Sequence, residues 1–371
     1  MSIEGKKLVI ITPSFKGGGA ERQAINQANY YAGLGVDVSM VVLRDEGPLR
    51  NLLSARVGVF CMVGHRPYLK TSKLLKKLQP EVVFAMLRKS NYIVGLSCYF
   101  NKNYRLVMRE GNTFESLAAL NRLKRVKTKL RLRMAYRNAD FLISNSQDAL
   151  KQLSKMKVAQ DIPQMVVGNP FDIEYIDERA QELAELPDWF KDPSLKVVLN
   201  VGRLHSQKNQ QMLIQAFAKA FAQDASLRLV IVGEGNQKER LESEIHRLGL
   251  SGVAAIHPFQ INPYPWLKAA DVFVLSSSRE GFPNVLAEAM ICGTPVVAVD
   301  CPGAVSDILG DGRWGYLSPM GDCESLAKNM IQATANSEIA TAARIRMHDF
   351  SRGKVQKQLD QILFPDCVSN E

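Results

Sequence analysis

The sequence predicts an α/β protein of two domains, each built on a doubly wound parallel sheet. Three observations lead to this fold class. The 371 residues exceed what one hydrophobic core usually holds, short apolar runs alternate with helical patterns in both halves, and a polar, acid-rich stretch at 172–193 separates the halves. We expect the first domain over 1–171 and the second over 172–352, with the amphipathic end, 353–371, a candidate to complete the first.

Apolar runs bounded by loops give the expected strands. In the first half they fall at 8–11, 36–43, 82–86, 106–108 and 141–144. In the second half they fall at 196–201, 228–232, 253–257, 271–275 and 296–299. Helical patterns separate these runs, beginning with 20–34, so parallel strands joined by crossover helices are expected.

The composition is that of a folded protein, with 46% hydrophobic and 23% charged residues. The six cysteines form no CxxC pair and the five histidines do not cluster, so neither a disulfide framework nor a zinc site is expected. No signal-peptide pattern starts the sequence, and the best internal apolar candidate, 92–100, is too short to span a bilayer. We expect a cytoplasmic protein, or one held peripherally at the inner face of the cell membrane.

Positive charge is concentrated in one segment of this chain, whose net charge is +10. No acid lies between Glu115 and Asp140, a stretch that carries eight cations: Arg122, Lys124, Arg125, Lys127, Lys129, Arg131, Arg133 and Arg137. Apolar residues at 123, 126, 130 and 134 recur at helical spacing, with Leu132 off this stripe. The pattern fits a solvated surface helix that packs its stripe on the domain, or a contact with anionic lipid or a pyrophosphate-linked lipid acceptor. Nucleic acid is not expected, because no aromatic residue interleaves the run before Tyr136.

A glycine-rich loop follows the first expected strand and opens a helix. Gly17, Gly18 and Gly19 let backbone amides approach an anion at the helix N-terminus, although a tight turn without ligand has the same pattern. A nicotinamide site is disfavoured, because Arg22 takes the third glycine position of that fingerprint and the second strand ends at Arg44 rather than at an acid.

A second loop, 202–209, places Arg203 and Lys208 after another strand and before a helix. A guanidinium and an ammonium at this spacing suit a diphosphate, although both can equally be solvated loop charges.

The third segment is 276–290, in which Glu280 lies in a loop and Glu288 one helical turn after Asn284. Pro283 suits the first helical positions and Asn284 suits capping, so free amides are expected to face a sugar-linked phosphate. The two carboxylates can accept hydroxyls from a sugar donor; alternatively, each caps a helix or pairs with Arg279.

The run EGFPNVLAEAM, followed by CGTPVVA, resembles the E-x7-E signature of the large retaining glycosyltransferase family with the GT-B fold, of the group 1 and family 4 type. Three further segments resemble that family's motifs in the same order: the GGAER loop at 18–22, the GRL-x3-K loop at 202–208 and the end-of-first-domain turn at Asn169-Pro170. The resemblance extends from about residue 8 to residue 322. It implies two Rossmann-like domains facing each other across a cleft, with a nucleoside diphosphate sugar held mainly by the second.

The resemblance also implies donor contacts. The matching positions are Gly17, Gly18, Gly19, Arg203, Lys208, Glu280, Gly281, Phe282, Pro283, Asn284, Val285 and Glu288. In this interpretation Arg203 and Lys208 hold the diphosphate and stabilise it as it leaves, Glu280 contacts the sugar, and Glu288 contacts the ribose. The residues proposed as catalytic are therefore Glu280, Arg203 and Lys208.

The sequence departs from the family in one place. Many members have a first-domain histidine close to the transferred sugar, whereas this chain offers Arg109, Glu110 and Asn112 as candidates for acceptor or sugar contact. The sequence also has no D-x-D segment, with which other transferases hold a metal, so no essential metal or other cofactor is expected.

The function implied is transfer of a hexose or N-acetylhexosamine, with retention, from a nucleoside diphosphate sugar, a UDP-sugar being favoured. The acceptor would be a glycan or a polyprenyl-pyrophosphate-linked glycan of bacterial surface polysaccharide or glycoconjugate synthesis. Two alternatives stay open: a sugar-nucleotide epimerase of the same architecture, and a non-catalytic module that binds the membrane surface.

Overall fold

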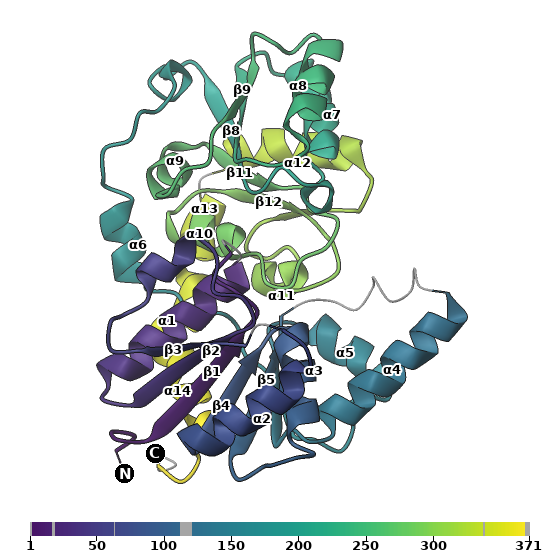
Figure 1. Cartoon of the computed structure of the whole chain (residues 1–371). Helices are drawn as coiled ribbons and strands as arrows, with labels where there is room; N and C mark the ends of the chain where they lie inside the picture. The colour runs from purple at the N-terminus through teal and green to yellow at the C-terminus, as the bar shows by residue number, and fades with distance from the viewer. Residues whose placement is uncertain (1, 17–18, 63, 112–120, 337, 368–371) are drawn as a thin grey trace. The chain divides into compact units, whose positions relative to one another are not determined.

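The computed structural model describes residues 2–16, 19–62, 64–111, 121–336 and 338–367. The chain forms two compact units, of which unit 1 comprises Met1–Asn169 and Val355–Glu371 and unit 2 comprises Pro170–Lys354 (Figure 1). Each unit is a parallel sheet covered by helices, so the α/β class expected from the sequence is confirmed.

Unit 1 is built on a seven-stranded parallel sheet with the order β3-β2-β1-β4-β5-β6-β7. Its strands are β1 (Lys7–Thr12), β2 (Asp37–Val42), β3 (Gly58–Cys61), β4 (Val82–Met86), β5 (Arg105–Glu110), β6 (Phe141–Ser144) and β7 (Gln164–Val166). Leu8 of β1 pairs with both Val38 of β2 and Val82 of β4, and the strand order reverses there. The carboxyl ends of all these strands lie along one edge.

Helices cover both faces of this sheet: α1 (Gly19–Gly33), α2 (Pro67–Leu78), α3 (Arg88–Ser97), α4 (Arg122–Tyr136), α5 (Gln147–Lys155) and, from Val355 onward, α14 (Arg352–Leu363). Successive side chains of β1 point to opposite faces of the sheet. Leu8 and Ile10 pack in one core cluster with Leu359 of α14, whereas Val9 and Ile11 pack in another with the α2–α5 side.

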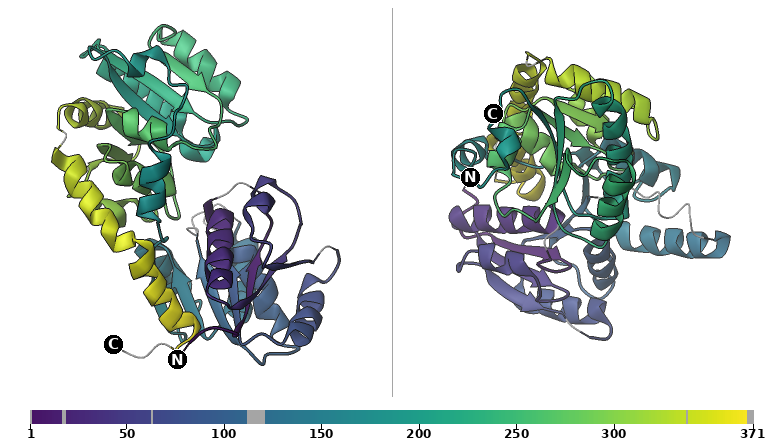
Figure 2. Two further views of the ribbon diagram at one scale, coloured as in Figure 1. Left: turned by 90° about the vertical axis from the view of Figure 1, so that its left-hand side faces the viewer. Right: turned by 90° about the horizontal axis from the view of Figure 1, so that it is seen from above.

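Helix α14 lies along the sheet of unit 1, as Figures 1 and 2 show. The buried Tyr31 of α1 donates its hydroxyl to Asp360 Oδ1 at 2.8 Å and accepts from Gln356 Nε2 at 2.7 Å. Arg105 Nε donates to the carbonyl of Ile362 at 2.8 Å. Burial raises the pKa of the Asp360 carboxyl, and Tyr31 and Gln356 supply the hydrogen bonds that keep this buried acid satisfied.

Unit 2 is built on a six-stranded parallel sheet with the order β10-β9-β8-β11-β12-β13. Its strands are β8 (Lys196–Val201), β9 (Leu227–Val232), β10 (Ala254–His257), β11 (Val272–Leu275), β12 (Val296–Val299) and β13 (Tyr316–Ser318). Val198 of β8 pairs with Leu229 of β9 and Val272 of β11, so the carboxyl ends of β8 and β11 are neighbours.

The helices of unit 2 are α6 (Ile173–Arg179), α7 (Gln210–Phe221), α8 (Lys238–Arg247), α9 (Tyr264–Ala269), α10 (Asn284–Ile291), α11 (Val305–Leu309), α12 (Cys323–Thr334) and α13 (Glu338–Met347). The acid-rich stretch that separates the halves contains α6, which is held to α13 by a two-pronged ion pair between Asp177 and Arg344 with N–O distances of 3.0 and 2.6 Å. Among the described residues, none of the helices has the length and apolar character to cross a bilayer.

Candidate active site

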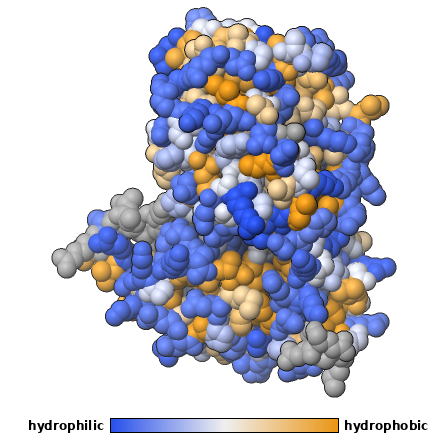
Figure 3. All heavy atoms as spheres, turned by 180° about the vertical axis from the view of Figure 1, so that it is seen from behind, coloured by the Kyte–Doolittle hydropathy of each residue, from blue (hydrophilic) through white to orange (hydrophobic). Residues whose placement is uncertain are grey.

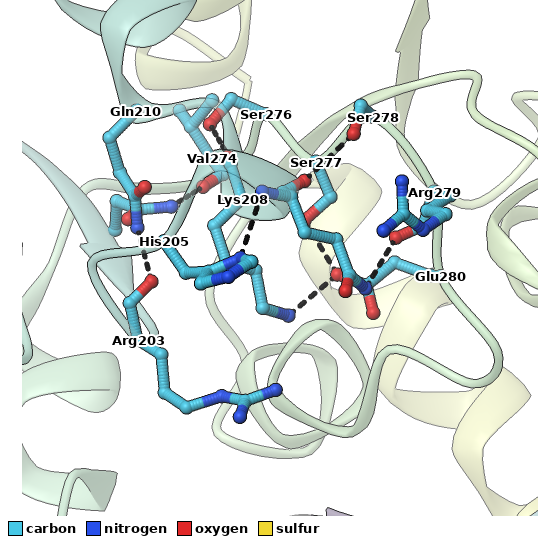
Figure 4. Close-up of polar contacts among 12 residues, drawn as sticks. Arg203, His205, Lys208, Gln210, Val274, Ser276, Ser277, Ser278, Arg279 and Glu280 are labelled. Carbon is cyan, nitrogen blue, oxygen red and sulfur yellow. Dashed lines mark hydrogen bonds and ion pairs between the residues drawn. The ribbon is translucent and has the colours of Figure 1, made fainter. Parts of the chain in front are cut away.

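Two polar loops meet at the carboxyl edge of the unit 2 sheet. The first, 202–209, follows β8, and the second, 276–283, follows the neighbouring strand β11. Hydrogen bonds join them: Ser278 N donates to the carbonyl of Gln207 at 2.8 Å, and Gln207 Nε2 donates to the carbonyl of Arg279 at 3.0 Å (Figure 4). The two loops, which the sequence presents as separate segments, therefore form one hydrogen-bonded surface.

Glu280 and Lys208 form an ion pair in this surface. Lys208 Nζ lies 2.6 Å from Glu280 Oε1, and the hydroxyl of Ser277 donates to the same oxygen at 2.5 Å (Figure 4). The carboxylate is only 6% exposed, so it is held by two partners inside the protein. Both contacts fall on Oε1, which leaves Oε2 to accept from a substrate hydroxyl, and an ammonium group has two further hydrogens for an anion.

Arg203 lies in the same loop as Lys208 but outside this cluster. Its side chain is exposed, and its guanidinium lies below the Lys208–Glu280 pair in Figure 4, with no contact to that pair drawn. The carbonyl of Arg203 accepts from Gln210 Nε2 at 3.1 Å, which fixes the backbone while the guanidinium stays without an ion pair in the described part of the chain. Arg203 is thus a cation available to an anionic ligand.

The alternative in which Glu280 pairs with Arg279 is wrong. Among the residues that the structure describes, Glu280 pairs with Lys208, while Arg279 is exposed and contributes its carbonyl to Gln207. Lys208 contacts Glu280 because its loop lies beside the loop that follows β11. The two loops are far apart in the sequence, so this contact could not be predicted from it.

The expected capping of α10 by Asn284 is also wrong. Pro283 occupies the N-cap position without a side-chain cap, and Asn284 is the first helical residue. The helix therefore starts one residue earlier than a cap at Asn284 would require. Because the proline ring offers no hydrogen-bond acceptor, the first turn has no hydrogen bond from the N-cap side chain.

Glu288 lies on α10, half-buried. Burial, followed by the nearby charge of Glu288, raises the pKa of the Cys292 thiol to about 12. Glu288 lies one helical turn before Cys292, the C-cap residue of α10, and Glu280 lies in the loop before this helix.

Gly303 fixes the backbone behind Glu280. The Glu280 N–H donates to the carbonyl of Pro302 at 2.9 Å, and Gly303 has a φ of +132°. A Cβ at this position would lie 1.7 Å from the carbonyl oxygen of Glu280, so only glycine fits without moving the loop.

We expect Gly303→Ala to lower the free energy of unfolding by at least about 2 kcal/mol, because the backbone strain and the overlap act together. Thermal unfolding measures this loss. Gly252→Ala is the matched control, since a Cβ there meets no atom within 4 Å and its backbone is unstrained. Equal melting temperatures for both variants would contradict the assignment.

The first-domain candidates lie at the end of β5. Arg109 is buried and donates to the carbonyls of Val167 and Gly168 and to Asn169 Oδ1 at 2.9–3.0 Å. Burial lowers the pKa of Arg109 to about 10, which leaves it charged at neutral pH. These contacts place the guanidinium inside unit 1, where it holds the segment that leads out of the unit.

Glu110 is also buried, accepts a hydrogen bond from the hydroxyl of Tyr136 and lies 3.6 Å from Arg88 Nε. The third candidate, Asn112, lies outside the described residues, as do Gly17 and Gly18. Gly19 begins α1 after β1. A direct contact of Glu110 with a sugar stays a prediction.

Helix α4 carries the run of cations seen in the sequence. Its expected stripe is solvent-exposed: Leu123 by 84%, Val126 by 60%, Leu130 by 57% and Met134 by 43%. The idea that this stripe packs on the domain is therefore wrong. The helix contacts unit 1 through Leu132, Ala135 and Tyr136, which are buried, and its N-terminal half extends away from the unit (Figure 1).

The cations surround this exposed stripe. Within the described side chains, Lys124, Arg125, Lys127, Lys129, Arg131 and Arg133 of α4 make no ion pair, and the side chain of Arg122 lies outside them. Arg133 Nε donates to the carbonyl of Lys157 at 2.8 Å. Figure 3, in which α4 lies at the left, shows apolar patches among hydrophilic surface there.

Sequence reasoning missed Ser277, Gln207 and His205. The serine run 276–278 before Glu280 was a usable signal, since a hydroxyl three residues before a loop carboxylate is within reach of it. His205 Nδ1 accepts from Gln207 N at 3.2 Å and so starts the short 3-10 turn Ser206–Lys208. Groups of three or more metal-ligating side chains are absent from the described residues.

Two family models match this chain. The model of glycosyl transferases group 1 matches residues 182–348, and the model of glycosyltransferase family 4 matches residues 17–175. The two matches fall on the two halves of the chain, and the group 1 match includes both loops of the site.

Curated relatives have related descriptions. The chain is 29% identical over 293 residues to the N-acetylgalactosamine-N,N'-diacetylbacillosaminyl-diphospho-undecaprenol 4-alpha-N-acetylgalactosaminyltransferase of Campylobacter jejuni, covering 78% of each chain. It is 26% identical over 349 residues to the lipopolysaccharide core biosynthesis glycosyltransferase LpsE of Rhizobium meliloti, covering 92% of this chain and 93% of LpsE.

Solved structures share the fold. The crystal structure of Anabaena HepE in complex with UDP matches with a TM-score of 0.83 at 22% identity, covering 96% of this chain and 99% of HepE. The lipopolysaccharide outer core galactosyltransferase WaaB matches with a TM-score of 0.73 at 18% identity, covering 97% and 99%. The two Rossmann-like sheets thus have the GT-B architecture. With the family models and the named relatives, this defines the chain as a glycosyltransferase.

Proposed function

We propose that this glycosyltransferase transfers a hexose or N-acetylhexosamine with retention from a nucleoside diphosphate sugar, most readily a UDP-sugar. The acceptor is a glycan or a polyprenyl-pyrophosphate-linked glycan in bacterial surface polysaccharide or glycoconjugate synthesis, made at the cytoplasmic face of the membrane. One observation carries the proposal: Glu280, held by Lys208 and Ser277, lies in one surface with the unpaired Arg203. The relatives named for undecaprenyl-linked and lipopolysaccharide glycans, and the HepE complexes with UDP and UDP-glucose, support the substrate classes.

The chemistry requires the anomeric carbon–oxygen bond to break while negative charge grows on the leaving diphosphate. In this proposal that charge is stabilised by Arg203, by the two remaining hydrogens of Lys208 and by the backbone amides of Phe282 and Val285 beside the start of α10. Glu280 accepts a sugar hydroxyl through Oε2, and Glu288 accepts the ribose hydroxyls.

In our proposal Arg203 and Lys208 stabilise the negative charge of the leaving diphosphate without a metal ion. Activity should therefore persist in excess chelator. A strict requirement for an added divalent ion would contradict this part of the mechanism. The sequence motivates it, since a D-x-D segment is absent from all 371 residues.

Product analysis tests the proposed reaction. UDP-sugars are screened first by thermal stabilisation, because a donor at 100 times its Kd adds about 2.7 kcal/mol to the free energy of unfolding. The stabilising donor is then incubated with and without a lipid-pyrophosphate-linked saccharide. Sugar transfer that occurs only in the presence of acceptor supports the proposal. An altered sugar nucleotide formed without acceptor would instead identify an epimerase. If the donor is not turned over at all, the protein is a binding module.

We further propose that α4 binds anionic lipid at the membrane surface. Each cation near such a surface contributes about 1 kcal/mol, and salt screens the attraction. Replacing Lys124, Arg125, Lys127 and Lys129 with glutamine should release the protein from anionic vesicles at moderate salt, as measured by sedimentation.

A second variant controls for the change in net charge. Replacing the exposed Arg240, Lys268, Arg313 and Lys328 of unit 2 with glutamine removes the same charge elsewhere. If the two variants partition alike, or if wild type does not bind, α4 is an ordinary surface helix.

A further inference from the structure

The positive charge of unit 1 extends beyond α4. Residues 47–139 contain 20 lysines and arginines but three acids, Glu81, Glu110 and Glu115. Glu81 pairs with Lys6 at 2.6 Å, and Glu110 is buried, so neither offsets the exposed cations. Four of these cations lie on α2, where Lys70, Lys73, Lys76 and Lys77 are all exposed. The basic surface thus covers α2 as well as α4.

Exposed aromatic rings lie between these two helices. Tyr99 and Phe100, which follow α3, are 50% and 59% exposed. The ring of Phe100 stacks on Tyr68 of α2 with centroids 6.0 Å apart, and the hydroxyl of Tyr99 donates to the carbonyl of Met134 at 3.0 Å. The rings therefore connect α2 with Met134, at the C-terminal end of the exposed stripe of α4.

Helix α4 is held firmly against α3 at this point. A Cβ at Gly95 would lie 2.2 Å from the carbonyl oxygen of Ala135, so the two backbones touch, and Asn138 Nδ2 donates to the Gly95 carbonyl at 2.8 Å. The aromatic rings and the end of the α4 stripe therefore keep a fixed spacing.

We propose that α2, the 99–100 turn and α4 form one membrane-docking face, in which Tyr99 and Phe100 enter the bilayer interface as a second anchor beside α4. This inference rests on the proposed lipid binding of α4 and adds an apolar contact point that fixes how unit 1 lies on the membrane. Tyrosine and other aromatic rings favour the interfacial region, and lysine stems extend their ammonium groups toward lipid phosphates.

The chemistry favours a lipid surface over a soluble polyanion. A polyanion would bind the cations of α2 and α4 but would leave Leu123, Val126 and Phe100 in water. A bilayer of anionic lipid can bind the cations and also bury the apolar side chains. Helices that lie in the membrane interface typically have apolar side chains surrounded by cations.

A tryptophan reporter tests the aromatic anchor. The native tryptophans, Trp189, Trp266 and Trp314, all lie in unit 2. Phe100→Trp should show a blue-shifted emission and quenching by brominated lipid when vesicles with 30% phosphatidylglycerol are added, after subtraction of the wild-type signal. Phe259→Trp is the matched control, because Phe259 is 57% exposed and lies in unit 2. It should show neither change.

A double variant, Tyr99→Ser with Phe100→Ser, measures the strength of the anchor. We expect about tenfold weaker vesicle binding or more, from the loss of apolar burial, with an unchanged dependence on salt. The four-glutamine variant of α4 should instead flatten the dependence on salt.

The outcomes separate the two proposals. If Phe100→Trp is silent while the four-glutamine variant is released, the aromatic anchor is overturned and lipid binding by α4 stands. Equal competition by heparin and by anionic vesicles, without quenching, would identify a polyanion site and overturn the anchor as well. As a control, the double serine variant should transfer sugar to a soluble acceptor at the wild-type rate. This result would show that the variant is folded and that the proposed reaction is unaffected.

Discussion

Glu280→Ala should abolish glycosyl transfer, lowering kcat by on the order of 100-fold or more, while the Kd for the donor rises much less. The carboxylate is held in place before any substrate arrives, since Lys208 and Ser277 both bind Oε1. Such a group interacts most strongly with a hydroxyl whose charge changes in the transition state. Donor binding by calorimetry and initial rates with saturating donor separate the two effects.

Glu288→Ala should have the opposite profile, with a raised Kd and a smaller loss in kcat, because the ribose does not react. Ser277→Ala should fall between wild type and Glu280→Ala in kcat, and Ser277→Thr should restore the rate because it keeps the hydroxyl. Unchanged binding and rate in both glutamate variants would remove Glu280 and Glu288 from the site.

Arg203→Ala and Lys208→Ala should each lower kcat by roughly 10²- to 10³-fold, the usual cost of losing one preorganised group that stabilises developing charge. Lys208→Ala should be the more harmful, because it also leaves Glu280 buried without its ion-pair partner. Rates at saturating donor, compared with the donor Kd, measure the effect.

Arg279→Ala is the matched control for these two variants. Arg279 is an exposed arginine next to Glu280, and its contact with Gln207 is made by the backbone carbonyl, which alanine keeps. Its rate should stay within a few-fold of wild type. A loss equal to that of Arg203→Ala would show that general positive charge, rather than the placement of Arg203, sustains the reaction.

Most of the fold was predictable from the sequence because parallel strands buried on both faces read as continuous apolar runs. The run 196–201 is β8 to the residue, and 82–86 is β4. The strands β3, β7 and β13 were missed, since they are three or four residues long and lie at sheet edges, where burial on both faces is not required.

The site was predictable as a set of loops but not as contacts. The residue types at 203, 208 and 280 indicated anion and sugar chemistry. The ion pair of Lys208 with Glu280, which are 72 residues apart, nevertheless arises from the adjacency of β8 and β11. The stripe of α4 was recognisable by its spacing, but spacing does not say which face of a helix meets the protein. Leu132, off the stripe, is buried together with Ala135 and Tyr136 because α4 crosses α3 near Gly95.

Unit 1 is assembled from two pieces of chain with all of unit 2 between them. During synthesis its seven strands leave the ribosome first, but the face that carries Leu8 and Ile10, on which α1 also packs, is fully covered only when Leu359 and its neighbours on α14 emerge. Unit 2 is one continuous segment and can close its core before that. The half that is translated first is therefore completed last, and in the interval a nascent apolar sheet face is open to chaperones and to other unfinished chains.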